Sequence, residues 1–136
     1  MSQYMFHMCS ADTWTSLKQS STPYYPPTYE ADGFIHLTAD PSLLLQVGNH
    51  FYKGDPGKWT LLVIDSSKLT SEVKFEPAAS VGERPSHGLT SRKTDEPLFP
   101  HLYGTIDFES IIEELDIKRG DDGTFLSIND IEKYCK

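Results

Sequence analysis

Five short stretches rich in apolar residues predict β-strands, some by alternation with polar residues and one by a continuous apolar run. They are residues 3–9, 33–38, 59–65, 72–76 and 111–117. The third contains Leu61-Leu-Val-Ile64, which is typical of a strand buried on both faces. In the fourth, we expect Val73 and Phe75 to point inward and the charged residues that alternate with them to face solvent.

Two further stretches have helical spacing. Ser10 can cap a helix over residues 11–20, in which Trp14 and Leu17 lie three positions apart. Asp40-Pro41 combines a capping side chain with proline at the first helical position, and predicts a helix to about residue 52. The expected buried positions of that helix are Leu44, Val47 and Phe51.

The C-terminal part predicts a turn near residues 107–110 and a hairpin at Asp122-Gly123. Ser127-x-x-Asp130 then resembles the capping box of a short terminal helix. Two to three helices unevenly placed among strands indicate an α+β fold, a single domain with a mainly antiparallel, split β-sheet.

The length of 136 residues fits one domain, residues 1–136, with one long irregular loop. That loop, residues 77–98, holds three prolines and two glycines and has no periodicity. Its basic residues are balanced by acidic ones, which favours a solvated loop; the alternative is a lid in which an arginine binds a phosphate.

Charge and cysteine content narrow the class of protein. The formal net charge of −8 argues against general nucleic-acid binding, because an acidic surface repels phosphates. We expect no membrane partner, since the chain has no apolar run of about 20 residues. Only Cys9 and Cys135 are present, far apart, so reduced thiols and a cytoplasmic location are expected, with a disulfide between them as the alternative. Nothing in the sequence identifies a protein partner.

Three phrases each place one histidine among apolar and aromatic residues. They are Tyr4-Met-Phe-His-Met-Cys9, Gly33-Phe-Ile-His-Leu-Thr38 and Phe99-Pro-His-Leu-Tyr-Gly104. Alternation puts Phe34, His36 and Thr38 on one side of their strand, and His101 on the same side as Tyr103. Such a mixture is typical of a ligand cleft, although each histidine could instead be a core residue bonded to the backbone.

The histidines allow several uses. Three neutral imidazoles could bind zinc in a hydrolase, but their sequence separation disfavours a metal site, and we predict none. Two imidazoles beside a hydroxyl could instead bind a ribose or phosphate and move protons. The remaining alternative is a non-catalytic module that binds a small ligand or a partner.

These phrases resemble the family of domain-of-unknown-function 952 proteins over most of the chain. The resemblance also includes Trp14, Asn49-His-Phe-Tyr52, Leu61-Leu-Val-Ile-Asp65 and Phe75-Glu76. That family is distantly similar to the ADP-ribosyltransferase fold, in particular to the branch with two histidines in the site. The resemblance implies an ADP-ribosyltransferase-like split sheet, with NAD as the cofactor or substrate held in its cleft.

By the same resemblance, His7 would contact the nicotinamide-side ribose, and His36 a second ribose or phosphate. The acid used by many transferases would have to be Glu76, the third expected catalytic residue, or else be absent, as in the two-histidine branch. The expected ligand-binding residues are Thr38, His101, Tyr103, Phe34 and Tyr52. The sequence thus leads to the hypothesis of a histidine-lined cleft for a nucleotide-like ligand, in an NAD-dependent ADP-ribosyl or glycosyl transferase or in a non-catalytic binding module.

Overall fold

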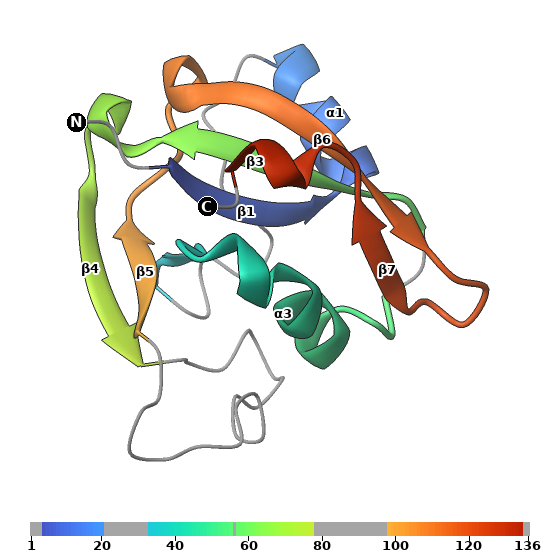
Figure 1. The fold of residues 1–136 in the computed structure, drawn as a ribbon. Helices are drawn as coiled ribbons and strands as arrows, with labels where there is room; N and C mark the ends of the chain where they lie inside the picture. The colour runs from blue at the N-terminus through green and yellow to red at the C-terminus, as the bar shows by residue number, and fades with distance from the viewer. Residues whose placement is uncertain (1–3, 21–32, 56, 78–97, 135–136) are drawn as a thin grey trace.

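The structure, a computed structural model, describes residues 4–20, 33–55, 57–77 and 98–134. Within these residues the chain forms a small α+β domain with two antiparallel sheets (Figure 1). The larger sheet has the strand order β1-β3-β6-β7 and the smaller one β2-β5-β4. The strands of the larger sheet are β1 (Tyr4–Ser10), β3 (Trp59–Asp65), β6 (Ile111–Arg119) and β7 (Phe125–Ile128). Those of the smaller sheet are β2 (Ile35–His36), β5 (Leu98–Tyr103) and β4 (Glu72–Pro77).

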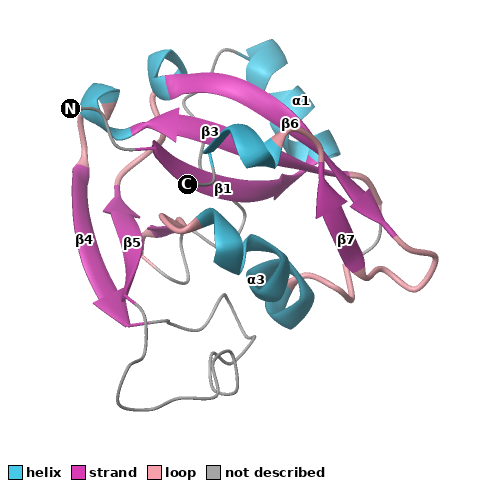
Figure 2. Ribbon diagram, in the orientation of Figure 1, coloured by secondary structure: helices cyan, strands magenta, loops and turns pink. Residues whose placement is uncertain are grey.

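The two α-helices of the described residues cover opposite faces of the larger sheet (Figure 2). Helix α3 (Leu44–Phe51) buries Leu44 and Phe51 against one face, where β1 contributes Phe6. Helix α1 (Ala11–Ser20) buries Trp14 against the other face. Strand β3 therefore contributes to two cores, and all four residues of its continuous apolar run are fully buried, as the sequence predicts.

The small sheet packs beside the α1 face, so that its apolar side joins the same core. Ile35 and Leu102 are fully buried there with Trp14. A single antiparallel bridge joins the two sheets, with Phe6 and Thr38 exchanging backbone hydrogen bonds of 2.8 Å. This bridge holds β1 next to the segment that follows β2.

The helical segment that contains α3 begins at Asp40-Pro41, as the sequence indicates. Asp40 Oδ1 accepts a hydrogen bond of 2.9 Å from the Ser42 N–H, and Pro41–Leu43 form a 3₁₀ turn before α3. Short 3₁₀ turns also occupy Ser66–Lys68, Phe108–Ser110 and Ile131–Tyr134. Gly123 has φ of 91° in the β6–β7 hairpin, and a Cβ there would lie 2.3 Å from the Lys53 carbonyl oxygen.

Four sequence-based expectations need correction. Phe75 is exposed, because β4 is an edge strand and only Val73 packs against the core. Val47 is only partly buried, and Gly48 is buried instead, where α3 approaches Phe125. The regular strand in residues 33–38 spans only Ile35–His36.

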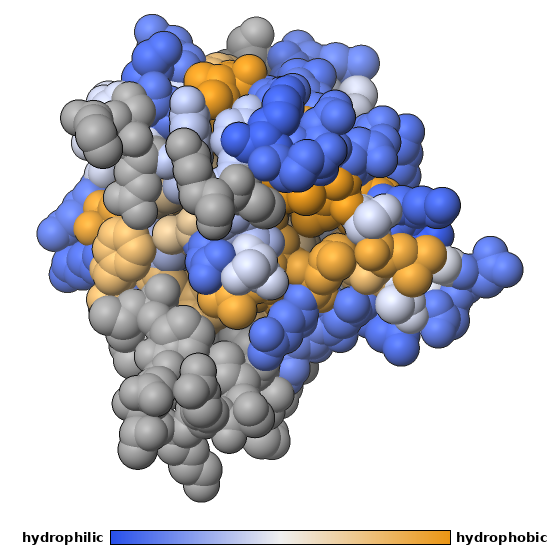
Figure 3. Space-filling view, in the orientation of Figure 1, coloured by the Kyte–Doolittle hydropathy of each residue, from blue (hydrophilic) through white to orange (hydrophobic). Residues whose placement is uncertain are grey.

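The fourth correction concerns the C-terminus. Ser127 belongs to β7, so it does not cap a helix; the terminal 3₁₀ turn follows Asp130, which has φ of 63°. Most of the predicted 77–98 loop and Cys135 lie outside the described residues, whereas Cys9 is buried. None of the helices in the described ranges has the length and apolar character needed to cross a membrane. Hydrophilic side chains cover much of the visible rim of the molecule, and apolar ones reach the surface toward its middle (Figure 3).

Candidate functional site

The central strand of the small sheet places two histidines side by side. Strand β5 alternates, with Leu102 in the core and His101 on the opposite face. The antiparallel register pairs His36 of β2 with His101, which brings both rings to one face, 5.6 Å apart between centroids. Two of the three histidines singled out in the sequence therefore meet.

Aromatic rings complete this face. Phe34 stacks on His101 with 4.2 Å between centroids and 23° between ring planes. The same Phe34 ring lies 4.7 Å from His36 and 5.3 Å from Tyr103. Because aromatic contacts of this kind favour one arrangement of the rings, Phe34 holds the His101 imidazole in a fixed orientation.

Glu76 reaches the same place from β4, whose register with β5 pairs Glu76 with Phe99 and Lys74 with His101. Its Oε1 accepts hydrogen bonds from His101 Nδ1 at 2.8 Å and from the Tyr103 hydroxyl at 2.7 Å. Nδ1 of His101 therefore carries a hydrogen, because a carboxylate oxygen can only accept. We call Phe34, His36, Glu76, His101 and Tyr103 the His101 cluster.

The hydrogen bonds also fix the charge of Glu76. The hydroxyl of Tyr103 and then the imidazole of His101 lower the pKa of Glu76 below its ordinary value of 4.5. Conversely, the hydrogen bond to Glu76 raises the pKa of Tyr103 above 10.0, so that the hydroxyl stays a donor. At neutral pH the cluster thus presents an ionised carboxylate held by two donors.

Burial differs sharply across the cluster. The His101 side chain is 3% exposed, whereas that of Glu76 is 38% exposed. Tyr103 is also exposed, and Phe34 and His36 are partly buried. A ligand arriving from solvent would therefore meet the carboxylate and the aromatic edges first, with His101 behind them.

His7 lies next to the cluster, but its ring is hydrogen-bonded to the backbone. Its Nδ1 donates a hydrogen bond of 2.8 Å to the His36 carbonyl oxygen, which ties β1 to β2. Burial lowers the pKa of His7 to about 4, because the charged imidazole would lose its hydration. His7 is consequently neutral at physiological pH. Thr38 is buried in the bridge between the sheets.

Tyr52 lies elsewhere. It follows α3, and its ring packs 4.7 Å from the Trp59 ring in the core beneath that helix. Asn49, at the start of the same Asn49–Tyr52 segment, is also a structural residue. Its side-chain amide exchanges hydrogen bonds of 2.7 and 3.1 Å with the Phe125 backbone. Within the part of the chain that is described, no group of three His, Cys, Asp or Glu residues could hold a metal.

Lys74 was not among the expected site residues, although it flanks the cluster. Its ammonium lies 5.1 Å from the centre of the Tyr103 ring, close enough for a cation–π interaction. The alternation in residues 72–76 contained the signal, because it places Lys74 and Glu76 on one side of the strand.

The arrangement combines three chemical capacities. Both hydrogen bonds that Glu76 makes to described residues end on Oε1, which leaves Oε2 to accept from a ligand hydroxyl. The aromatic edges of Phe34 and Tyr103 offer a surface for a flat ring. The carboxylate charge can stabilise a positive charge that develops nearby.

Comparisons with known proteins agree with the fold. The crystal structure of protein CC0527 from Caulobacter crescentus is 22% identical, with a TM-score of 0.67, covering 91% of this chain and 94% of that one. The solution NMR structure of CC0527 is 21% identical, with a TM-score of 0.62, covering 96% and 95%. None of the curated proteins compared with the chain matches it. The family model described as "Protein of unknown function (DUF952)" matches residues 8–114. The chain therefore belongs to the DUF952 family.

Proposed function

We propose that the His101 cluster binds a nucleotide-like ligand and that the chain acts there as an NAD-dependent ADP-ribosyl or glycosyl transferase. The observation that carries the proposal is the ionised Glu76, held by His101 and Tyr103 beside exposed aromatic edges. A ribose offers hydroxyl donors to a carboxylate, and a base or nicotinamide ring offers a flat face to aromatic side chains. The two antiparallel sheets are compatible with the resemblance to ADP-ribosyltransferases.

NAD would supply a ribosyl group whose bond to nicotinamide breaks with its electron pair on the nicotinamide nitrogen, while an acceptor oxygen bonds the anomeric carbon and gives its proton to solvent water. The chain's own residues would act on the ribose. Glu76 Oε2 would accept from a ribose hydroxyl and so orient the sugar. The negative charge of Glu76 would stabilise the oxocarbenium-like transition state. His101 and Tyr103 would hold the carboxylate in place during the reaction.

His7 favours a second candidate, a non-catalytic ligand-binding module. Its ring is buried, its pKa is about 4, and its Nδ1 bonds a backbone carbonyl, all of which suit a structural residue. Without His7, the groups available for proton transfer are fewer than the family resemblance implies. The same side chains of the His101 cluster would then bind a nucleotide without converting it.

Thermal stabilisation and product release separate the two candidates. The full chain would be incubated with NAD, with ADP-ribose and with a water blank, while the melting temperature and released nicotinamide are measured. Stabilisation with nicotinamide release supports the transferase, and stabilisation without release supports the binding module. If neither compound raises the melting temperature, the nucleotide proposal is wrong.

A matched pair of histidine variants tests the location. His36→Ala should abolish the stabilisation by ligand, because His36 belongs to the ring cluster. His50→Ala is the control, since His50 lies on α3 and contacts the Phe51 ring at 4.6 Å. Equal loss of ligand stabilisation in both variants would contradict a site at the His101 cluster.

A further inference from the structure

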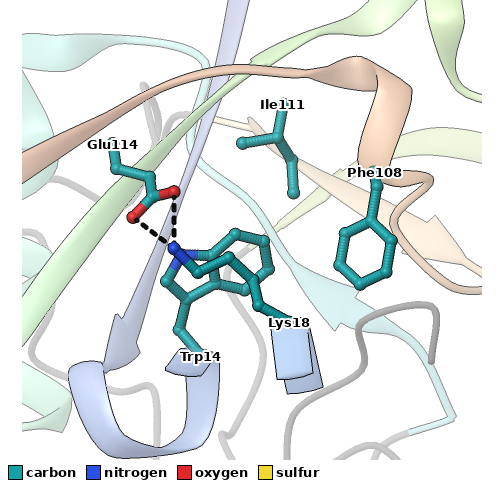
Figure 4. A pocket seen from close by; sticks show the side chains of 5 residues that line it. All are labelled: Trp14, Lys18, Phe108, Ile111 and Glu114. Carbon is teal, nitrogen blue, oxygen red and sulfur yellow. Dashed lines mark hydrogen bonds and ion pairs between the residues drawn. The ribbon is translucent and has the colours of Figure 1, made fainter. Parts of the chain in front are cut away.

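A pocket lies between α1 and the start of β6, with the 3₁₀ turn that precedes β6 (Figure 4). Its volume is about 320 Å³, near the lower end of the range for small-ligand sites. The described residues that line it are Trp14, Lys18, Phe108, Ile111 and Glu114. None of them belongs to the His101 cluster, so the pocket is a separate feature of the molecule.

One end of this pocket is apolar. Trp14 is 4% exposed and its ring lies 5.8 Å from that of Phe108, and Ile111 also lines the pocket. All three residues belong to, or pack against, the core beneath α1. They form a firm wall against which an apolar side chain of a ligand could lose its contact with water.

The other end carries one positive and one negative group. Lys18 Nζ lies 3.2 and 3.4 Å from the two carboxylate oxygens of Glu114, and Figure 4 shows this pair beside Trp14. The ammonium also lies 5.4 Å from the centre of the Trp14 ring. The Lys18 and Glu114 side chains are 45% and 40% exposed, so their ion pair is weak and can rearrange at little cost.

The opposite charges select the class of ligand. An anion would be attracted by Lys18 but repelled by Glu114, and a cation would meet the reverse problem. A ligand with both charges satisfies both groups, because Lys18 keeps a further donor and Glu114 keeps further lone pairs. The adjoining apolar wall requires that the ligand also carry a ring or a branched hydrocarbon group.

We infer that this pocket binds a zwitterionic α-amino acid with an aromatic or branched apolar side chain. Its carboxylate bonds Lys18, its ammonium bonds Glu114, and its side chain packs against Trp14 and Phe108. This inference is independent of the nucleotide proposal, since the two sites share no residue.

The indole N–H signals of the two tryptophans give a test with an internal control. Trp14 lines the pocket, whereas Trp59 belongs to the core on the opposite face of the larger sheet. In two-dimensional NMR of the full chain, L-phenylalanine should move the Trp14 signal saturably and leave that of Trp59 in place. The amide of phenylalanine, which lacks the carboxylate, and N-acetyl-phenylalanine, which lacks the ammonium, should bind at least about tenfold more weakly. Glycine should have no effect.

Charge-neutral variants locate the contacts. Lys18→Met and Glu114→Gln should each weaken phenylalanine binding about tenfold. Glu113→Gln is the matched control. Glu113 does not line this pocket, and its carboxylate lies 2.8 Å from the Lys133 ammonium in a partly exposed ion pair. A Trp14 signal that does not move at about 10 mM phenylalanine overturns the inference. Equal binding of the amide or the acetyl derivative also overturns it, since the pocket would then recognise only the ring.

Discussion

Two carboxylates of this protein are held in similar ways but in different surroundings. Glu76 accepts from Tyr103 and His101, while Glu113 accepts from the Tyr134 hydroxyl and from Lys133. Both side chains are partly exposed, at 38% and 30%. In each case the hydrogen bonds lower the pKa of the carboxyl below 4.5, so both carboxylates are ionised at neutral pH. Exposure and charge alone therefore do not distinguish them.

The partners make the difference. Lys133 can only donate, and Tyr134 packs its ring 5.1 Å from Tyr4 and 5.8 Å from Phe6, so this group fastens the C-terminal turn to the first strand. His101 donates to Glu76 through Nδ1, and its ring lies among the aromatic rings of the His101 cluster. The hydrogen-bond partners of a carboxylate, and not its exposure or charge, therefore make Glu76 the candidate site residue.

The largest expected effect is a loss of folding stability in acid that depends on His7. His7 has a pKa of about 4 in the folded chain and about 6.5 in the unfolded one, so the unfolded chain binds more protons between these values. The free energy of unfolding should fall by roughly 3 kcal/mol as the pH drops from 6.5 to 4. Urea titrations over this range measure it.

His7→Asn is the informative variant, because its amide can still donate to the His36 carbonyl but does not titrate. The variant should lose most of the pH dependence, and His50→Asn should keep it. Above about pH 4.5 Glu76 and Glu113 do not interfere, since carboxyls with a lowered pKa lose their contribution only below that pH. Equal pH profiles for the wild type and His7→Asn would contradict the assignment.

The second effect concerns ligand binding. Glu76→Gln should weaken binding of NAD or ADP-ribose about tenfold to a hundredfold, because it removes the charged acceptor. Glu113→Gln removes an equivalent charge outside the His101 cluster and should leave the affinity unchanged. Isothermal titration of both variants measures the difference. If the two variants bind equally, the comparison between the carboxylates has no functional meaning.

The third effect concerns the tyrosines and stability. Tyr134→Phe should lower the free energy of unfolding by roughly 1 kcal/mol, since it deletes the hydrogen bond to Glu113 at a partly buried position. Tyr103→Phe should change it less, because Tyr103 is exposed. Chemical denaturation of both variants is the measurement, and a larger loss for Tyr103→Phe would reverse the roles given to the two pairs.

The smallest effect belongs to Lys133. Its side chain is 52% exposed, and ion pairs in that setting contribute little. Lys133→Met should therefore shift the melting temperature less than Tyr134→Phe does, and added salt should have little effect on that shift. A loss of stability as large as that of Tyr134→Phe would show that the ion pair, and not the tyrosine, fastens the C-terminal turn.

Much of the fold followed from local patterns. The continuous apolar run of β3 predicted burial on both faces, and Asp40-Pro41 predicted the start of the helical segment. The expectation for Phe75 was wrong because alternation states which side a residue occupies, but not whether another layer covers that side. The Ser127 cap was wrong because β7 pairs with β6 and takes Ser127 into the sheet.

The candidate site was partly accessible from the sequence. Alternation placed His36 with Phe34 and His101 with Tyr103, and the family resemblance named Glu76. The resemblance also named Tyr52, which lies in the other core, since a shared phrase does not tell a site residue from a packing residue. The pocket beside Trp14 could not be predicted from the sequence, because its lining residues Trp14 and Glu114 are a hundred positions apart.

The sequence by itself determined which residues share a face of each strand, because side chains alternate with a local period of two. Only the tertiary structure decided that Glu76 meets His101, since the register of β4 on β5 depends on packing between segments 25 residues apart. The same holds for His7, whose type suggested proton transfer but whose burial and bond to the His36 carbonyl keep it neutral. Residue type sets what a side chain can do, and its surroundings set which protonation state and partner it has.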